Sequence, residues 1–265
     1  MSPDKVAIGN RKDPPTDRLF LRAAALPTNT GSSSAFIGYG SDGRTWRVKV
    51  LNNPQQGPTL VAEFLVGRLG KLIDAPVCEV DLMWISEDHR GWQYSAGNPQ
   101  LRLEPGFASA SLEVPDTVEI RSLEHRHEDD NARRHVGIYA LYDWCLGSDD
   151  QWLYRGDDGN KAYSHDHGMY LCAGRWWDGT QADRFTRPNE LGAPKDDLDP
   201  GAIASCVASL HGLTADALAT VLVGVPPSWP VTDEQLNQLG DLLLVRAAEV
   251  AHRLEAPSGK GSAAP

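Results

Sequence analysis

Strand-like and helical patterns occupy different parts of this chain, and this separation limits the folds that it can adopt. Residues 18–95 hold several short strand-like runs, two of which flank a turn at residues 41–43 and would pair as a hairpin. Among them lies one segment with helical spacing, residues 59–73, with Thr59 as its expected N-cap. From about residue 199 the spacing is helical. This order predicts an α+β fold with a small β-rich lobe that contains one helix and a larger, mostly helical lobe.

The same patterns suggest domain boundaries. Residues 1–17 are polar and rich in proline, so they are expected to form a flexible N-terminal segment, and residues 256–265 are of low complexity and are expected to be disordered. Residues 18–100 would form the N-terminal lobe and residues 101–255 the C-terminal lobe. In the helical part, N-capping residues that mark helix starts stand at Asp199, at Thr214 and at Thr232, which forms a capping box with Gln235.

Charge and composition exclude several classes of partner. The 265 residues carry a formal net charge of -11 at pH 7, and the 25 Lys and Arg are scattered, so nucleic acid would be repelled. No run of about 18 apolar residues is present, and the first residues lack the apolar core of a secretion signal. The four cysteines lie far apart, which argues against disulfides and a cysteine-rich zinc site. We therefore expect a cytoplasmic protein without nucleic-acid or integral membrane contacts.

A loop rich in glycine and serine leads into the hairpin. Residues 28–40 read TNTGSSSAFIGYG. Successive backbone N–H groups in such a turn, with serine hydroxyls around them, can surround a phosphate group. A plain turn has a similar composition, so the pattern alone leaves both interpretations open. The candidate phosphate-binding residues are Gly31, Ser32, Ser33 and Ser34.

Lys49 stands among alternating apolar residues in the second half of the hairpin. If Val48 and Val50 face one side of the strand, Lys49 faces the other, where a buried lysine would need an anionic partner. Glu63, in the helical segment that follows, could be that partner. An exposed strand lysine fits the same spacing.

Two carboxylate-bearing segments follow in the C-terminal part. Residues 147–153 read GSDDQWL, in which Asp149 or Asp150 could act as a base and Gln151 could contribute to a metal site; an acidic turn after a helix is the alternative. Asp166 lies one hairpin further on, in the triplet His-Asp-His that Gly168 follows. Gly168 would permit a turn at the end of the strand. Both carboxylate segments could then share a divalent cation.

The order of these elements is that of phosphoryl transfer by protein-kinase-like enzymes. The segments GSSSAFIGYG, RVKVLNNPQ, TLVAEFLVGRLGKLIDAPV, DWCLGSDDQWL and YSHDHGMYL resemble the HipA-like kinases, which belong with the phosphatidylinositol 3- and 4-kinase-like branch of the kinase fold. The resemblance covers roughly residues 22–172. It implies a two-lobed kinase-like fold and an ATP-dependent phosphotransferase that uses Mg²⁺ or Mn²⁺.

The resemblance also implies residue roles. Lys49 would contact the ATP phosphates and Glu63 would hold it, while residues 31–34 would lie over the phosphates. Asp150, or Asp149 in its place, would be the catalytic base. Asp166 and Gln151 would hold the metal ion. The acceptor would be a hydroxyl of a protein or a small molecule.

The segment GSDDQWL departs from the family pattern, because it is short and places Gln151 where an asparagine is usual. The longer side chain alters the geometry around Mg²⁺, which requires near-octahedral ligands. One alternative is therefore a catalytically silent kinase fold that binds nucleotide. A second is a metal-dependent hydrolase that uses His165, Asp166 and His167, since alternate residues of a strand share a face.

Overall fold

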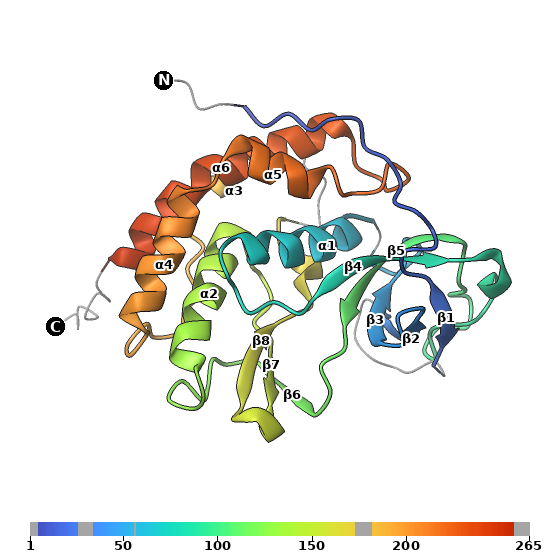
Figure 1. Ribbon diagram of the computed structural model, residues 1–265, viewed down its shortest axis with the longest axis horizontal. Helices are drawn as coiled ribbons and strands as arrows, with labels where there is room; N and C mark the ends of the chain where they lie inside the picture. The colour runs from blue at the N-terminus through green and yellow to red at the C-terminus, as the bar shows by residue number, and fades with distance from the viewer. Residues whose placement is uncertain (1–4, 26–33, 56, 173–181, 257–265) are drawn as a thin grey trace.

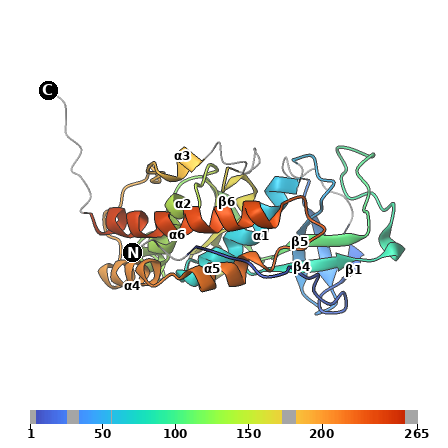
Figure 2. The ribbon, with the colours of Figure 1, turned by 90° about the horizontal axis from the view of Figure 1, so that it is seen from above.

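A computed structural model of the chain shows the two lobes side by side (Figures 1 and 2). The structure describes residues 5–25, 34–55, 57–172 and 182–256. The N-terminal lobe is built on a five-stranded sheet, and the C-terminal lobe is mostly helical with a small three-stranded sheet. The expected two-lobed α+β architecture is confirmed.

The five-stranded sheet is antiparallel in all its described pairings and has the strand order β1-β2-β3-β5-β4. The expected hairpin is present, with Gly43 in the left-handed conformation (φ 80°) at its turn. Trp46 and Val48 face one side of β3 and are buried in an apolar cluster, so Arg47 and Lys49 face the other side. The five strands are β1 Leu21–Ala24, β2 Phe36–Gly40, β3 Thr45–Lys49, β4 Val80–Ile85 and β5 Gly106–Leu112.

Strand β5 corrects the expected domain boundary. It pairs with both β3 and β4, so the N-terminal sheet extends to Leu112 and not only to residue 100. The sequence of β5, GFASASL, consists largely of small residues that have low β-propensity, and it lacks the usual alternation. Pairing on both sides stabilises the strand, and the sequence alone gives no signal of it.

The single helix of the N-terminal lobe, α1 (Gly57–Leu72), is buried along most of its length and lies against the sheet. A Cβ atom at Gly67 would lie 2.6 Å from the side chain of Val80, so glycine allows the helix to pack directly on β4. The expected N-cap was wrong. The helix begins at Gly57, and Thr59 is a buried residue of its first turn, where Pro58 is also compatible with helical geometry.

The C-terminal lobe surrounds α1 with further helices (Figure 1). Its small sheet has the order β6-β7-β8, and β7 and β8 form the expected hairpin, with Gly159 in the left-handed conformation at its turn. The expected caps are confirmed: Asp199 and Thr214 each accept a backbone N–H bond, and Thr232 forms the capping box with Gln235. The elements are α2 Asn131–Trp144, β6 Thr117–Ile120, β7 Trp152–Arg155, β8 Lys161–Ser164, α3 Ala182–Phe185, α4 Pro200–His211, α5 Ala215–Leu222 and α6 Asp233–Glu255.

The N-terminal segment was expected to be flexible, but its described residues are attached to α6 (Figure 1). The backbone N–H of Val6 donates to Asp241 Oδ1 at 2.7 Å, and that of Ile8 donates to Asn237 Oδ1 at 2.8 Å. The side chain of Val6 is buried close to Gly240, where a Cβ atom would lie 2.6 Å from it. The C-terminal tail beyond Ala256 lies outside the described residues.

Among the residues that the structure describes, no single helix is long and apolar enough to cross a membrane. Helices α4 and α5 pass that test only when they are taken together, as a pair bent by 87°.

Candidate active site

A cavity of about 480 Å³ is lined by both lobes. This volume is within the range of small-molecule binding sites. Strand β3 contributes Arg47 and Lys49 to the wall, and α1 contributes Glu63. The C-terminal lobe contributes the residues for which chemistry was expected, Asp149, Gln151, His165 and Asp166.

Lys49 lines this wall and is 6% exposed. Its Nζ atom donates to Glu63 Oε2 at 2.6 Å, and it also contacts Asp166 Oδ1. Burial alone would lower the pKa of Lys49, but the charges of Glu63 and Asp166 outweigh burial and raise that pKa above its usual value. The expected contact between Lys49 and Glu63 is present, and Asp166 is a second partner that the sequence did not indicate.

Asp166 follows β8 in a left-handed conformation, with φ 51° and ψ 58°. This conformation is uncommon for residues other than glycine, and it directs the chain away from the strand geometry. Gly168 was expected to provide the turn, but it has no positive φ. A Cβ atom at Gly168 would lie 3.5 Å from Lys49 Nζ, an ordinary van der Waals distance, so neither the backbone conformation nor the available space requires glycine there. Burial acts to raise the pKa of Asp166, and the Lys49 ammonium more than offsets this, so the pKa is lowered.

The two adjacent aspartates after α2 point in different directions. Asp149 is partly buried and lines the cavity with Asp166 and Gln151. Burial, followed by the charge of Asp166, raises the pKa of Asp149. Asp150 is exposed and hydrogen-bonds with Tyr142, whose pKa is raised by burial and by this contact. Of the two candidates for the base, the geometry therefore favours Asp149 over Asp150.

The loop that carries Asp149 is anchored at its start. Ser148 Oγ donates to the carbonyl of Met169 at 2.7 Å, which connects this loop to the segment after Asp166. Asn189 Nδ2 donates to the carbonyl of Gly147 at 2.9 Å. Neither role was expected from the sequence. Ser148 belongs to GSDDQWL but carries no charge that would mark it, and Asn189 lies beyond the segments that resemble the family.

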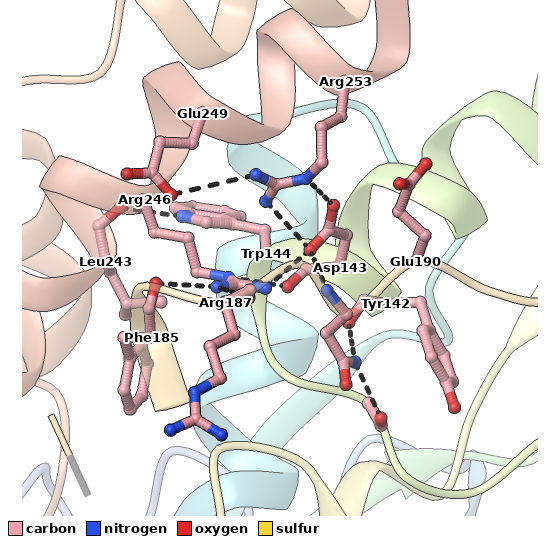
Figure 3. A network of polar contacts seen from close by, with 12 residues as sticks. Tyr142, Asp143, Trp144, Phe185, Arg187, Glu190, Leu243, Arg246, Glu249 and Arg253 are labelled. Carbon is pink, nitrogen blue, oxygen red and sulfur yellow. Dashed lines mark hydrogen bonds and ion pairs between the residues drawn. The ribbon is translucent and has the colours of Figure 1, made fainter. Parts of the chain in front are cut away.

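Asn189 is in turn held by a buried charge network at the end of α2 (Figure 3). Its backbone N–H donates to Asp143 Oδ1, which also accepts from Arg246 of α6 at 2.6 Å. Arg246 is fully buried, and its other N–H groups donate to the carbonyls of Asp143, Phe185 and Arg187. Helix α6 thus fixes the segment that supports the loop of Asp149.

The histidines on either side of Asp166 do not share a face, because the chain leaves the strand after Ser164. His165 lines the cavity, and its Nε2 atom lies 3.5 Å from Glu119 without forming a hydrogen bond. His167 is directed into the interior, where its Nε2 atom lies 2.8 Å from Ser164 Oγ. Within the described ranges, no group of three or more His, Cys, Asp or Glu could hold a metal ion. The expected two-histidine arrangement was therefore wrong.

Burial of His167 has a consequence for stability at low pH. Burial lowers the pKa of His167 to about 3 from 6.5, so the unfolded chain binds a proton in a pH range where the native protein does not. Stability is therefore expected to fall as the pH falls from 6.5 towards 3. In urea unfolding between pH 6 and 4, His167→Gln should reduce this slope by about 1.4 kcal/mol per pH unit. The exposed His127, changed to Gln, is the control; equal slopes in His167→Gln and the parent would contradict the assignment.

The Gly/Ser loop is only partly described. Gly31, Ser32 and Ser33 lie outside the described residues, so their expected role stays a prediction. Ser34 is partly buried and has a positive φ of 50°. Ala35, which follows it, lines the cavity.

The cavity also contains residues that the sequence did not single out. Arg47 forms an ion pair with Glu113, to which Nη2 donates at 2.9 Å. Arg121, just after β6, also lines the wall. Apolar residues also contribute to the lining, namely Ala35, Leu112, Val114, Leu153 and Met169.

A curled sheet with one buried helix, a mostly helical second lobe, and a cavity that joins a Lys–Glu pair to carboxylates of the second lobe define a kinase-like protein. The sequence model of the HipA-like kinase family matches residues 24–168, more than half of the chain. The chain belongs to the HipA-like kinase family. No curated protein sequence matches it.

Solved kinase structures share the fold at low sequence identity. The Golgi casein kinase is 10% identical with a TM-score of 0.51, over 89% of this chain and 73% of that chain. The Helicobacter pylori proinflammatory kinase CtkA is 8% identical with a TM-score of 0.51, over 89% of this chain and 97% of that chain. The Golgi casein kinase with Mn/ADP bound is 9% identical with a TM-score of 0.51, over 89% and 72%. These likenesses establish the two-lobed kinase fold.

Proposed function

We propose that the protein is a phosphotransferase that moves the γ-phosphoryl group of Mg-ATP to a hydroxyl of a protein or small-molecule acceptor. The observation that carries this proposal is the convergence of Lys49, Glu63, Asp149 and Asp166 on one cavity. These residues come from β3, from α1, from the loop after α2 and from the turn after β8. The Mn/ADP complex of a kinase with the same fold supports a nucleotide and a divalent metal as ligands.

The charges in the cavity favour a nucleotide that binds together with a divalent cation. Five carboxylates and three cationic side chains line the wall, so a triphosphate alone would meet a negative field. Burial and the neighbouring charge of Asp166 raise the pKa of Asp149, and a cation would relieve this repulsion between carboxylates. Asp166 and Gln151 offer the oxygen atoms that Mg²⁺ prefers. When bound, the ion would neutralise phosphate charge.

The protein side chains have separate roles in this proposal. Lys49, held by Glu63, binds the phosphates, and the Gly/Ser loop covers them. Asp149 acts as the general base and accepts the proton of the acceptor hydroxyl. The acceptor oxygen then forms its bond to the γ-phosphorus, and the bond from that phosphorus to the bridging oxygen of ADP breaks.

The apolar side chains of the cavity lining suit the nucleotide base. Leu112 and Val114, at the end of β5, line the cavity, as do Ala35, Leu153 and Met169. A flat base can bury its faces between such side chains, which stabilises binding through the hydrophobic effect. In this proposal the base packs against apolar side chains of the lining, and the transferred phosphoryl group lies near Asp149.

A catalytically silent nucleotide-binding protein is the second candidate. The observation that favours it is Gln151, which lines the cavity at a position where the family usually has asparagine. Both candidates bind nucleotide, so only turnover separates them.

Turnover of Mg-ATP tests the proposal. We expect the parent protein to release ADP from ATP when Mg²⁺ or Mn²⁺ is present, and Asp166→Asn to lose this activity by about a hundredfold or more, because the metal ligand is weakened. Asp158→Asn, an exposed position in the β7–β8 turn, is the matched control and should retain the parent rate. Binding without turnover in the parent would instead support the silent alternative.

A further inference from the structure

The three cationic side chains of the cavity differ in their partners. Lys49 is engaged by Glu63 and Asp166. Arg47 is engaged by Glu113. Arg121 makes no hydrogen bond or ion pair with any residue that the structure describes, although it lines the same wall. Among the described residues, Arg121 is therefore the cavity cation whose charge is not engaged in an ion pair.

Arg121 lies beside the loop that carries Asp149. In the antiparallel β6–β7 pairing, Ile120 is opposite Trp152. Arg121 follows Ile120 and Gln151 precedes Trp152, so continuing this register brings Arg121 next to Gln151. Asp149, Gln151 and Arg121 line one wall. Burial and Asp166 raise the pKa of Asp149, and the charge of Arg121 acts in the opposite direction. Strand pairing, cavity lining and electrostatics thus agree on this position.

The loop itself provides no cation. Residues 147–153, GSDDQWL, contain neither lysine nor arginine. Phosphoryl transfer spreads negative charge over the oxygens of the transferred group, and fixed positive charges near them stabilise the transition state. Lys49 is engaged by two carboxylates, so a neighbouring segment is the source of an additional protein charge next to Asp149.

We infer that Arg121 binds the γ-phosphoryl group of ATP and stabilises its charge during transfer. The inference rests on the proposed function and adds a residue to it. Arg121 takes no part in the proton transfer. The proton of the acceptor passes to Asp149, the acceptor oxygen forms its bond to the γ-phosphorus, the bond from that phosphorus to the bridging oxygen breaks, and ADP leaves with that bonding pair. The guanidinium contributes charge-assisted hydrogen bonds, for which its planar fork of N–H donors fits phosphate oxygens.

The comparison of ATP with ADP tests this role, because only ATP carries the γ-phosphoryl group. We expect Arg121→Gln to weaken Mg-ATP binding by about tenfold or more, as measured by calorimetry, and to leave Mg-ADP binding unchanged. Turnover should fall by about a hundredfold. Arg121→Lys keeps the charge but not the fork, so it should recover part of both losses. Arg155→Gln, at the opposite end of β7 and outside the cavity wall, is the control and should match the parent.

Each other outcome overturns the inference in a distinct way. Equal losses for ATP and ADP would place Arg121 on the part of the nucleotide that both share. Unchanged binding and turnover would remove Arg121 from the nucleotide altogether and leave it for an anionic group of the acceptor. Absence of ATP binding in the parent would overturn the proposed function itself, and with it this inference.

Discussion

Asp149→Asn is expected to reduce the turnover of Mg-ATP by about a hundredfold or more, whereas Asp150→Asn should leave it close to that of the parent. The two residues are neighbours and carry the same charge, so they form a matched pair. Only Asp149 lines the cavity with Asp166, while Asp150 is exposed and bonded to Tyr142. An asparagine cannot accept the proton of the acceptor hydroxyl, so loss of the base should lower the rate of the chemical step.

The measurement is ADP release at saturating Mg-ATP, together with the dissociation constant of Mg-ADP. A fall in rate for Asp149→Asn with retained ADP binding would assign the base. If Asp150→Asn shows the larger loss, the assignment of the two aspartates is reversed.

Arg246→Met is expected to lower the free energy of unfolding by about 3–5 kcal/mol. The guanidinium is fully buried and donates hydrogen bonds to the side chain of Asp143 and to three backbone carbonyls (Figure 3). Its removal therefore leaves these acceptors without that donor. Arg253 still pairs with Asp143, which limits but does not abolish the cost. The loss should appear in urea unfolding at neutral pH.

Arg187→Met is the matched control for this effect. Its side chain is 74% exposed and, among the described residues, pairs with Asp183 alone, so its removal should change the free energy of unfolding by less than about 0.5 kcal/mol. The carbonyl of Arg187, which accepts from Arg246, is unaffected by the substitution. A loss below about 1 kcal/mol in Arg246→Met would show that the network is not a principal support of the C-terminal lobe.

The sequence predicted the elements that depend on local signals. The β2–β3 hairpin follows from alternation around Gly43, and the helix starts at Asp199, Thr214 and Thr232 follow from capping side chains. These signals are contained within a few residues of each other, so the rest of the fold is not needed to interpret them. Strand β5 lacks such a signal, since its small residues are ordered by their neighbours in the sheet.

The candidate site shows the same division. The order of Lys49, Glu63 and Asp166 along the chain indicated that they would converge, and they do. Asp149 and Asp150 could not be separated, because neighbouring residues in an irregular loop have no fixed periodicity from which direction can be inferred. Arg246 lies in α6, whose apolar spacing predicts the buried face of the helix. Arginine side chains are usually exposed, and the sequence does not show the acceptors that allow this one to be buried.

The most direct measurement is a thermal-shift assay of nucleotide binding, in which ATP is titrated in the presence and absence of Mg²⁺. A ligand that binds only the native state stabilises it by about 2.7 kcal/mol at a hundredfold excess over its dissociation constant. We expect ATP to raise the melting temperature of the parent only when Mg²⁺ is present, and Asp166→Asn to lose most of this increase. No increase at millimolar Mg-ATP would contradict the assignment of the cavity as a kinase active site.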